Sequence, residues 1–207
     1  MTEETPSTVL KKFFPPVLVG LVKDYMRNPT KEEFLKMIKD GHLRFSHLVL
    51  YGLDLSNFSM TGRMFSNCNF IGANLSNTDL SESDLSGSEF SNASLVKTNL
   101  TEASLNCTEF VNSNLSGAYL SGARLEHVIF NNANLSNADF EDAYLTDVNF
   151  EGANLESADF EYARLHCVNF EGANLKHAIF QYGRLDNVCL DFNEGIYLDD
   201  YNVLLYT

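Results

Sequence analysis

Residues 133–160 read ANLSN ADFED AYLTD VNFEG ANLES ADF, a five-residue repeat in which every fifth residue is Leu or Phe. The same rhythm extends in both directions, since Leu, Phe or Met stands at every fifth position from Leu50 to Leu190. These twenty-nine large residues comprise eighteen Leu, ten Phe and one Met. The residue two places before each large residue is usually small, and the other three places hold mostly Asn, Asp, Ser, Glu and Gly.

A period of five fits neither an amphipathic helix, which repeats about every 3.6 residues, nor a flat strand, which repeats every two. It does fit a chain that turns a corner every five residues. The large residue and the small residue two places before it then point inward, and the other three residues point outward. The pattern therefore predicts a tube with an apolar interior and a polar surface.

The large residues also fall into four columns with a period of twenty, which we call the four faces. The first face holds Leu50, Phe70, Phe90, Phe110, Phe130, Phe150, Phe170 and Leu190, and the second holds Leu55, Leu75, Leu95, Leu115, Leu135, Leu155 and Leu175. The third face holds Met60, Leu80, Leu100, Leu120, Phe140, Phe160 and Phe180, and the fourth holds Phe65, Leu85, Leu105, Leu125, Leu145, Leu165 and Leu185. Because like residues stack at a spacing of twenty, four pentapeptides make one coil. The sequence thus predicts an all-β solenoid: a right-handed quadrilateral parallel β-helix of about seven coils and roughly 35 Å length.

Several segments resemble the pentapeptide-repeat family, whose consensus is Ala-(Asp/Asn)-Leu-X-X. The matching segments are Ala73-Asn74-Leu75, Ala133-Asn134-Leu135, Ala153-Asn154-Leu155, Ala158-Asp159-Phe160 and Ala173-Asn174-Leu175. The resemblance implies the same fold. It says little about function, because the family includes topoisomerase-binding DNA mimics, bacterial effectors and many members of unknown role.

Both ends of a stacked tube have open sheet edges, which proteins cover. Residues 1–44 are predicted to form a helical N-terminal cap, residues 45–192 the repeat, and residues 193–207 a C-terminal cap or dimerisation tail. In the N-terminal cap, Thr30 and Glu33 form a capping box that begins a helix, and Gly41 can end it. A second helix is expected from Pro16 to Tyr25.

The C-terminal tail loses the five-residue rhythm after Leu190 but stays rich in large residues. The candidate contact residues are Tyr197, Tyr201, Leu204, Leu205 and Tyr206. Two interpretations stay open. The tail joins two tubes end to end in a two-fold homodimer, or it folds over the last coil of its own chain.

The formal net charge is −14, and it is unevenly spread. Residues 1–44 hold eight Lys/Arg and six Asp/Glu, a balance of +2, whereas residues 45–207 hold six and twenty-two, a balance of −16. Such a surface repels nucleic acid, so we expect no direct nucleic-acid binding. A protein that normally grips nucleic acid could still be attracted to it.

Targeting signals and disulfide patterns are both missing from the sequence. We find no signal peptide and no membrane span, so we expect no membrane partner and a cytoplasmic location. A secreted effector without a readable signal is the alternative. Four cysteines without a CxxC pair favour a reducing compartment; they are Cys68, Cys107, Cys167 and Cys189.

Outward residues form columns too, and a column of reactive side chains could form a catalytic or metal site. One turn column reads Gly87, Cys107, His127, Asp147, Cys167 and Asn187. Its members stand in a straight line roughly 5 Å apart, so Cys107 and Cys167 cannot share one zinc ion. His166 and His177 are expected to be exposed turn residues. We therefore predict no catalytic residues, no metal, no cofactor and no enzymatic activity.

Two further outward columns have clearer roles. Asn74, Asn114, Asn134, Asn154 and Asn174 are predicted to form a structural hydrogen-bonded ladder. The second column, which we call the arginine column, consists of Arg124, Tyr144, Arg164 and Arg184. Tyr144 could stack with its Arg neighbours by cation–π contacts, and Arg and Tyr favour protein interfaces.

The arginine column is therefore a candidate partner-binding site, together with the nearby residues Tyr119, Tyr162 and Tyr182. The alternative is self-stacking that only neutralises local acid. The function expected first is a non-enzymatic protein–protein interaction solenoid whose partner is another protein. One alternative is a DNA mimic that binds a type II topoisomerase, as in the quinolone-resistance branch of the family. The other is a bacterial effector that acts on a host protein.

Overall fold

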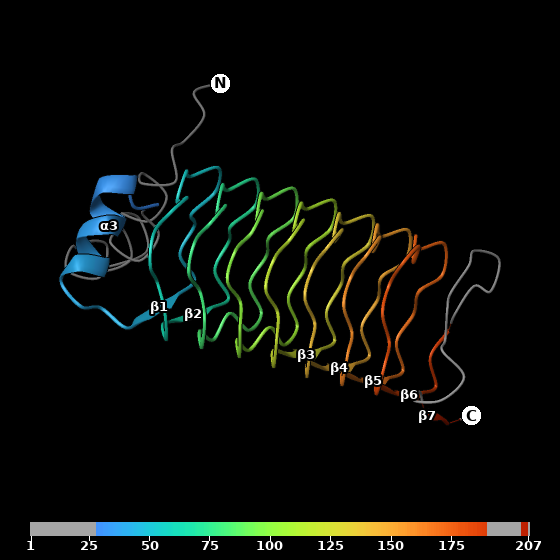
Figure 1. The fold of residues 1–207 in the computed structure, drawn as a ribbon. Coiled ribbons are helices and arrows are strands. Elements are labelled where there is room, and N and C mark those ends of the chain that lie inside the picture. The colour runs from blue at the N-terminus through green and yellow to red at the C-terminus, as the bar shows by residue number, and fades with distance from the viewer. Residues whose placement is uncertain (1–27, 190–203, 207) are drawn as a thin grey trace, which may run out of the picture.

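The computed structural model describes residues 28–189, together with the backbone of residues 204–206. These residues form a parallel β-solenoid of about seven turns with one short helix at its N-terminal end (Figure 1). Backbone bridges join residues twenty apart on every side, for example Val49 to Asn69 and Asp54 to Asn74. The predicted coil of four pentapeptides is confirmed.

Longer strand pairing occurs only on the fourth face of the described region, and every pair is parallel. The helix is α3 (Lys31–Lys39), and the strands are β1 (Arg44–Ser46), β2 (Met64–Ser66), β3 (Arg124–Glu126), β4 (Tyr144–Thr146), β5 (Arg164–His166), β6 (Arg184–Asp186) and β7 (Leu204–Tyr206). Strands β1 and β2 make one sheet, and β3 to β7 make a second in chain order. The second sheet therefore presents a flat, regular wall at the C-terminal half of the tube.

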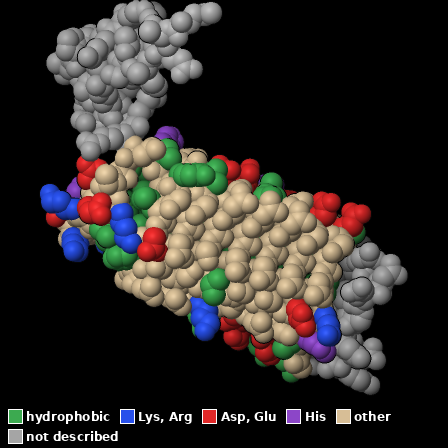
Figure 2. All heavy atoms as spheres, turned by 90° about the horizontal axis from the view of Figure 1, so that it is seen from above, with side chains coloured by type: hydrophobic (Ala, Val, Ile, Leu, Met, Phe, Trp, Pro, Cys, Tyr) green, Lys and Arg blue, Asp and Glu red, His purple; other side chains and the backbone are tan. Residues whose placement is uncertain are grey.

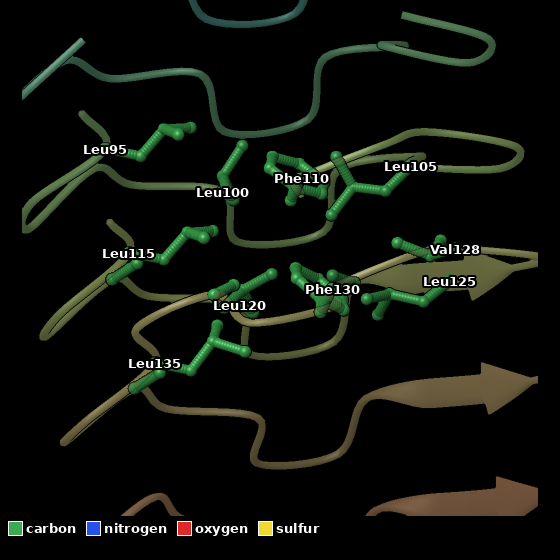
Figure 3. Packing of buried hydrophobic residues seen from close by; sticks show 14 of the residues in the cluster. Leu95, Leu100, Leu105, Phe110, Leu115, Leu120, Leu125, Val128, Phe130 and Leu135 are labelled. Carbon is green, nitrogen blue, oxygen red and sulfur yellow. The ribbon is translucent and has the colours of Figure 1, made fainter. Parts of the chain in front are cut away.

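The interior consists of the large residues that the repeat predicts. Every one of them from Leu50 to Leu185 is at most 3% exposed, and Leu190 lies outside the described residues. Leu stacks on Leu and Phe on Phe from coil to coil (Figure 3). On the first face, successive rings from Phe70 to Phe170 lie 4.8–5.1 Å apart with interplanar angles of 2–11°. This spacing is the rise of one coil, so the backbone pairing itself brings the rings into stacking distance.

Each corner of the tube uses the same backbone conformation. Every residue two places after a large one, from His47 to Asn187, has a φ of 52–70°. In most turns the next residue donates its N–H to the carbonyl of the large residue, as Ala73 does to Phe70 at 2.9 Å, which is the pattern of a type II turn. None of these positive-φ positions holds Val, Ile or Thr, whose branched side chains would be strained there. The backbone conformation of the turns is thus one reason why these positions hold residues other than branched apolar ones.

The turns that leave the fourth face in the C-terminal half are more open. Those after Leu125, Leu145 and Leu165 lack this turn hydrogen bond, and here the small position is Val128, Val148 or Val168. The backbone before each turn is extended enough to form strands β3, β4 and β5.

The N-terminal helix α3 begins at the predicted capping box. The Thr30 hydroxyl accepts from the Glu33 N–H at 3.2 Å, and the Glu33 carboxylate accepts from the Thr30 N–H at 2.9 Å. Gly41, at a φ of 81°, follows the helix and donates to the Ile38 carbonyl. The first helix is confirmed, whereas the second, predicted from Pro16, lies outside the described residues.

One side chain of α3 closes the open end of the tube. Phe34 is fully buried, with its ring centre 5.5 Å from that of Phe45 and 6.3 Å from that of Phe65. Phe45 is 3% exposed and pairs with Phe65 on the fourth face, so the inward register begins one pentapeptide before Leu50. The repeat and its cap therefore share one core.

At the other end, β7 pairs with β6 in the same parallel sheet. Leu205 lies opposite Leu185, twenty residues earlier, so the tail regains the register that it loses after Leu190. The edge of β6 is thus paired within the same chain. Tyr197 and Tyr201 lie outside the described residues, and the homodimer stays a prediction.

Among the described helical residues, no segment is long and apolar enough to cross a membrane. Figure 2 shows one broad side of the tube covered mainly by uncharged polar side chains and backbone, with acidic side chains along its margins.

Candidate interaction surface on the fourth face

The arginine column forms on the fourth face as predicted. Strand pairing places Arg124 opposite Tyr144, Tyr144 opposite Arg164, and Arg164 opposite Arg184. The Arg164 guanidinium carbon lies 5.4 Å from the centre of the Tyr144 ring, which confirms one of the expected cation–π contacts. Tyr144 remains 48% exposed, so the contact orders the ring without hiding it.

Two shallow depressions lie along this column, and together we call them the fourth-face groove. The first has a volume of about 360 Å³ and is lined by Asn106, Arg124, Leu125, Glu126, Tyr144 and Thr146. The second, of about 260 Å³, is lined by Tyr144, Leu145, Thr146, Arg164, Leu165, His166, Arg184 and Asp186. Tyr144 and Thr146 line both, so the two depressions adjoin at β4.

Of the other predicted tyrosines, Tyr162 and Tyr182 lie beside the groove and Tyr119 does not. Tyr162 and Tyr182 stand in the turns that enter the fourth face, two residues before Arg164 and Arg184, and their rings stack at 4.9 Å and 12°. Each is almost half exposed. Tyr119 pairs with Asp139 on the third face, so it belongs to the neighbouring wall rather than to the groove.

Carboxylates crowd on the third face beside the tyrosine pair. Asp139 and Asp159 pair in adjacent coils, and Glu141, Asp142 and Glu161 follow them in the turns. Desolvation first, and then repulsion from these four neighbours, raises the pKa of Glu141 above its ordinary value. We call these five residues the acidic cluster.

The acidic cluster also acts on Tyr162. Desolvation, followed by the charges of Glu161 and others, raises the pKa of the Tyr162 phenol. The phenol therefore loses its proton only at a higher pH than an ordinary tyrosine does.

The predicted asparagine ladder occupies the second face, opposite the groove. Asn134, Asn154 and Asn174 each donate to the side-chain oxygen of the Asn one coil earlier, at 3.2, 3.1 and 2.9 Å. Each of these oxygens also accepts a backbone N–H two residues ahead, as Asn134 does from Ser136. The ladder from Asn114 to Asn174 is structural, as predicted. Asn74 does not join it, because Ser94 stands between Asn74 and Asn114, and the Asn74 amide instead donates to the Asp54 carboxylate at 3.0 Å.

Family models match most of the repeat. A model of a pentapeptide repeat region matches residues 123–195, and a model of eight pentapeptide-repeat copies matches residues 65–106 and 93–132. The chain belongs to the pentapeptide-repeat family. No curated protein matches this pentapeptide-repeat protein significantly by sequence.

Two solved structures show the same fold. HetL, a pentapeptide-repeat protein involved in heterocyst differentiation regulation from the cyanobacterium Nostoc sp. strain PCC 7120, is 26% identical. The alignment has a TM-score of 0.56 and covers 77% of this chain and 79% of HetL. Trypsin-treated QnrB1, a plasmid-mediated fluoroquinolone resistance protein, is 22% identical, with a TM-score of 0.56 and coverage of 78% and 91%.

One arrangement in this pentapeptide-repeat protein was missed from the sequence. The turn column of Cys107, His127 and Cys167 holds no group of three metal-binding side chains within the described residues. However, the Cys167 sulfur lies 3.4 Å from His166 Nε2, and His166 Nδ1 lies 2.9 Å from the Asp186 carboxylate. A single column does not contain this set, because Cys167 belongs to the column next to that of His166 and Asp186. His177 is exposed, as predicted.

Proposed function

We propose that this pentapeptide-repeat protein is a non-enzymatic, protein-binding rod and that the fourth-face groove is its docking surface. The observation that carries the proposal is the ordered row of exposed Tyr and Arg side chains along two adjoining depressions. Tyr and Arg dominate the binding energy of protein interfaces because they combine large contact area with directional polar groups.

The backbone and side chains of the groove are preorganised for binding. Its floor is a parallel sheet in which each coil is hydrogen-bonded to the next, and Arg164 rests on Tyr144. Rigid side chains lose little conformational freedom on binding, which leaves more of the contact energy as affinity.

The charges of the groove suggest the chemistry of the partner. Arg124, Arg164 and Arg184 are three of the six basic residues among residues 45–207, and the acidic cluster lies on the adjacent face. A partner that presents carboxylates to the groove, and basic or polar groups to its margin, would complement the positive charge of the arginines and the negative charge of the acidic cluster. Guanidinium groups also suit carboxylates because they donate two parallel hydrogen bonds.

Replacing Arg124 and Tyr144 together with alanine should weaken partner binding by about tenfold or more. Both side chains are exposed, so the fold should be unaffected. The measurement is a quantitative pull-down from cell lysate, followed by the affinity of the purified partner. As a matched control, Glu156→Ala with Lys176→Ala changes an exposed pair of opposite charges, 3.9 Å apart, on the second face. Equal capture by both double variants would contradict the proposal.

A second candidate function rests on the acidic cluster and on the net charge of −14. A rod with crowded carboxylates could present itself to a DNA-binding protein as DNA does, and we propose a type II topoisomerase as the alternative partner. The QnrB1 likeness contributes the fold to this candidate and no more.

The DNA-mimic candidate predicts an effect on DNA gyrase. Micromolar protein should inhibit supercoiling or protect the enzyme from a quinolone, and Asp139→Asn with Glu141→Gln and Asp159→Asn should reduce that effect several-fold because the mimicked charge is lost. A supercoiling assay with and without quinolone measures both. Neither inhibition nor protection by the intact protein would exclude this candidate and leave the groove proposal standing.

A further inference from the structure

The turn after β5 brings a thiol, an imidazole and a carboxylate into one hydrogen-bonded chain. Cys167 Sγ lies 3.4 Å from His166 Nε2, and His166 Nδ1 lies 2.9 Å from Asp186 Oδ2. Both backbone segments are fixed, because Cys167 donates its N–H to the Asp186 carbonyl at 2.9 Å and His166 pairs with Asp186 in the sheet. The side chains therefore start from a rigid frame.

The order of these three groups sets the direction of proton transfer. The Asp186 carboxylate can only accept, so it favours the imidazole tautomer that carries its proton on Nδ1. Nε2 of His166 is then free to accept the proton of the Cys167 thiol. The thiolate that forms lies beside an imidazolium, which is the arrangement that makes a cysteine nucleophilic.

We propose that Cys167 is a reactive thiol that forms a mixed disulfide with a small anionic disulfide. In this step the thiol proton moves to His166 Nε2, the Cys167 sulfur attacks one sulfur of the disulfide, and a new S–S bond forms. The original S–S bond breaks, and the departing sulfur leaves as a thiolate. One disulfide is consumed and one is made, so no further oxidant is needed.

The anionic character of the reagent follows from the groove beside the thiol. His166 and Asp186 line the same depression as Arg164 and Arg184. These guanidinium groups would raise the local concentration of an anionic reagent. A modification here would also place a bulky, charged group at the margin of the proposed docking surface.

The chain contains its own controls. Cys107 occupies the same turn position three coils earlier, with a φ of 57° against 53° at Cys167, and it is exposed. Its preceding residue is Asn106, whose side chain instead accepts the Glu126 N–H. Burial raises the pKa of Cys68 to about 11, so that thiol should stay unreactive.

The test compares two variants that keep one turn cysteine each. Cys107→Ser with Cys189→Ser leaves Cys167, and Cys167→Ser with Cys189→Ser leaves Cys107. Each is mixed with dithiobis(nitrobenzoate), an anionic aromatic disulfide, and the released thiolate is followed by absorbance. We expect Cys167 to react about tenfold faster than Cys107 near neutral pH.

Two further variants assign the roles of the partners. His166→Gln should bring the rate of Cys167 down to that of Cys107, and Asp186→Asn, which changes a positioning residue, should lower it partially. The pH dependence separates these effects from a structural change. The rate of intact Cys167 should fall less between about pH 8 and about pH 6 than the rate of the His166→Gln variant.

Charged groups surround the Cys167–His166 pair on three neighbouring coils. Asp147 lies one coil earlier, where its N–H donates to the His166 carbonyl and its carboxylate lies 3.7 Å from His127. Arg164 lies on the same strand as His166, and Arg184 and Asp186 lie on β6. A Cys167 rate no higher than that of Cys107, or a rate unchanged by His166→Gln, would overturn the proposal.

Discussion

Replacing Phe150 with alanine should lower the free energy of unfolding by about 3–5 kcal/mol, one of the largest effects expected for a single substitution in this protein. The Phe150 ring is fully buried and stacks between Phe130 at 5.0 Å and Phe170 at 5.1 Å. It also meets the edges of Phe140 at 5.9 Å and Phe160 at 6.2 Å. The stacked coils are held by backbone pairing on all sides, so they cannot collapse into the cavity that alanine leaves.

The matched control is Phe150→Leu, because Leu50 occupies the same face of the first coil. Leucine keeps most of the volume, and we expect it to cost less than about 1.5 kcal/mol. Urea denaturation followed by circular dichroism measures both variants. A loss below about 1 kcal/mol for the alanine variant would show that the phenylalanine stack does not stabilise the tube as its geometry indicates.

The second large effect is expected at the N-terminal end. Phe34→Ala should destabilise the cap by about 3 kcal/mol, since it removes the side chain that closes the tube against Phe45 and Phe65. The Arg63 guanidinium also holds this end, since it donates to the carbonyls of Ile38 and His42 at 3.4 and 3.3 Å. These polar contacts remain in the variant, so the loss of stability should come only from the missing Phe34 ring.

Native-state hydrogen exchange distinguishes this local effect from a global one. In a repeat protein each coil contacts only its neighbours, so protection should fall in α3 and β1 and persist in β4 and β5. Lys36→Ala, on the same helix but with a side chain that is 79% exposed, is the control and should change stability by less than about 0.5 kcal/mol. Unchanged protection of α3 in the Phe34 variant would contradict a plugging role.

The repeat could be predicted from the sequence because its two periods have one simple geometric solution. A large residue every five positions requires a corner every five, and like residues every twenty require four corners in a coil. The N-terminal helix was equally readable, since Thr30 and Glu33 form a local motif that needs no tertiary contact. The asparagine ladder and the arginine column could be predicted from the period of twenty, because residues twenty apart lie directly over one another.

The tertiary structure decided two features: the pairing of β7 with β6, and the contacts between side chains of neighbouring columns. Leu205 pairs with Leu185 although the pentapeptide pattern lapses between them, because a strand pairs through its backbone whatever the preceding side chains are. The chain from Cys167 through His166 to Asp186 depends on side-chain direction across two coils, which no periodicity encodes. The sequence by itself thus determined the tube and the order of its outward columns, since those follow from spacing alone. Only the packed structure decided which neighbouring side chains meet. Such contacts depend on side-chain rotamers and on the more open turns that leave the fourth face.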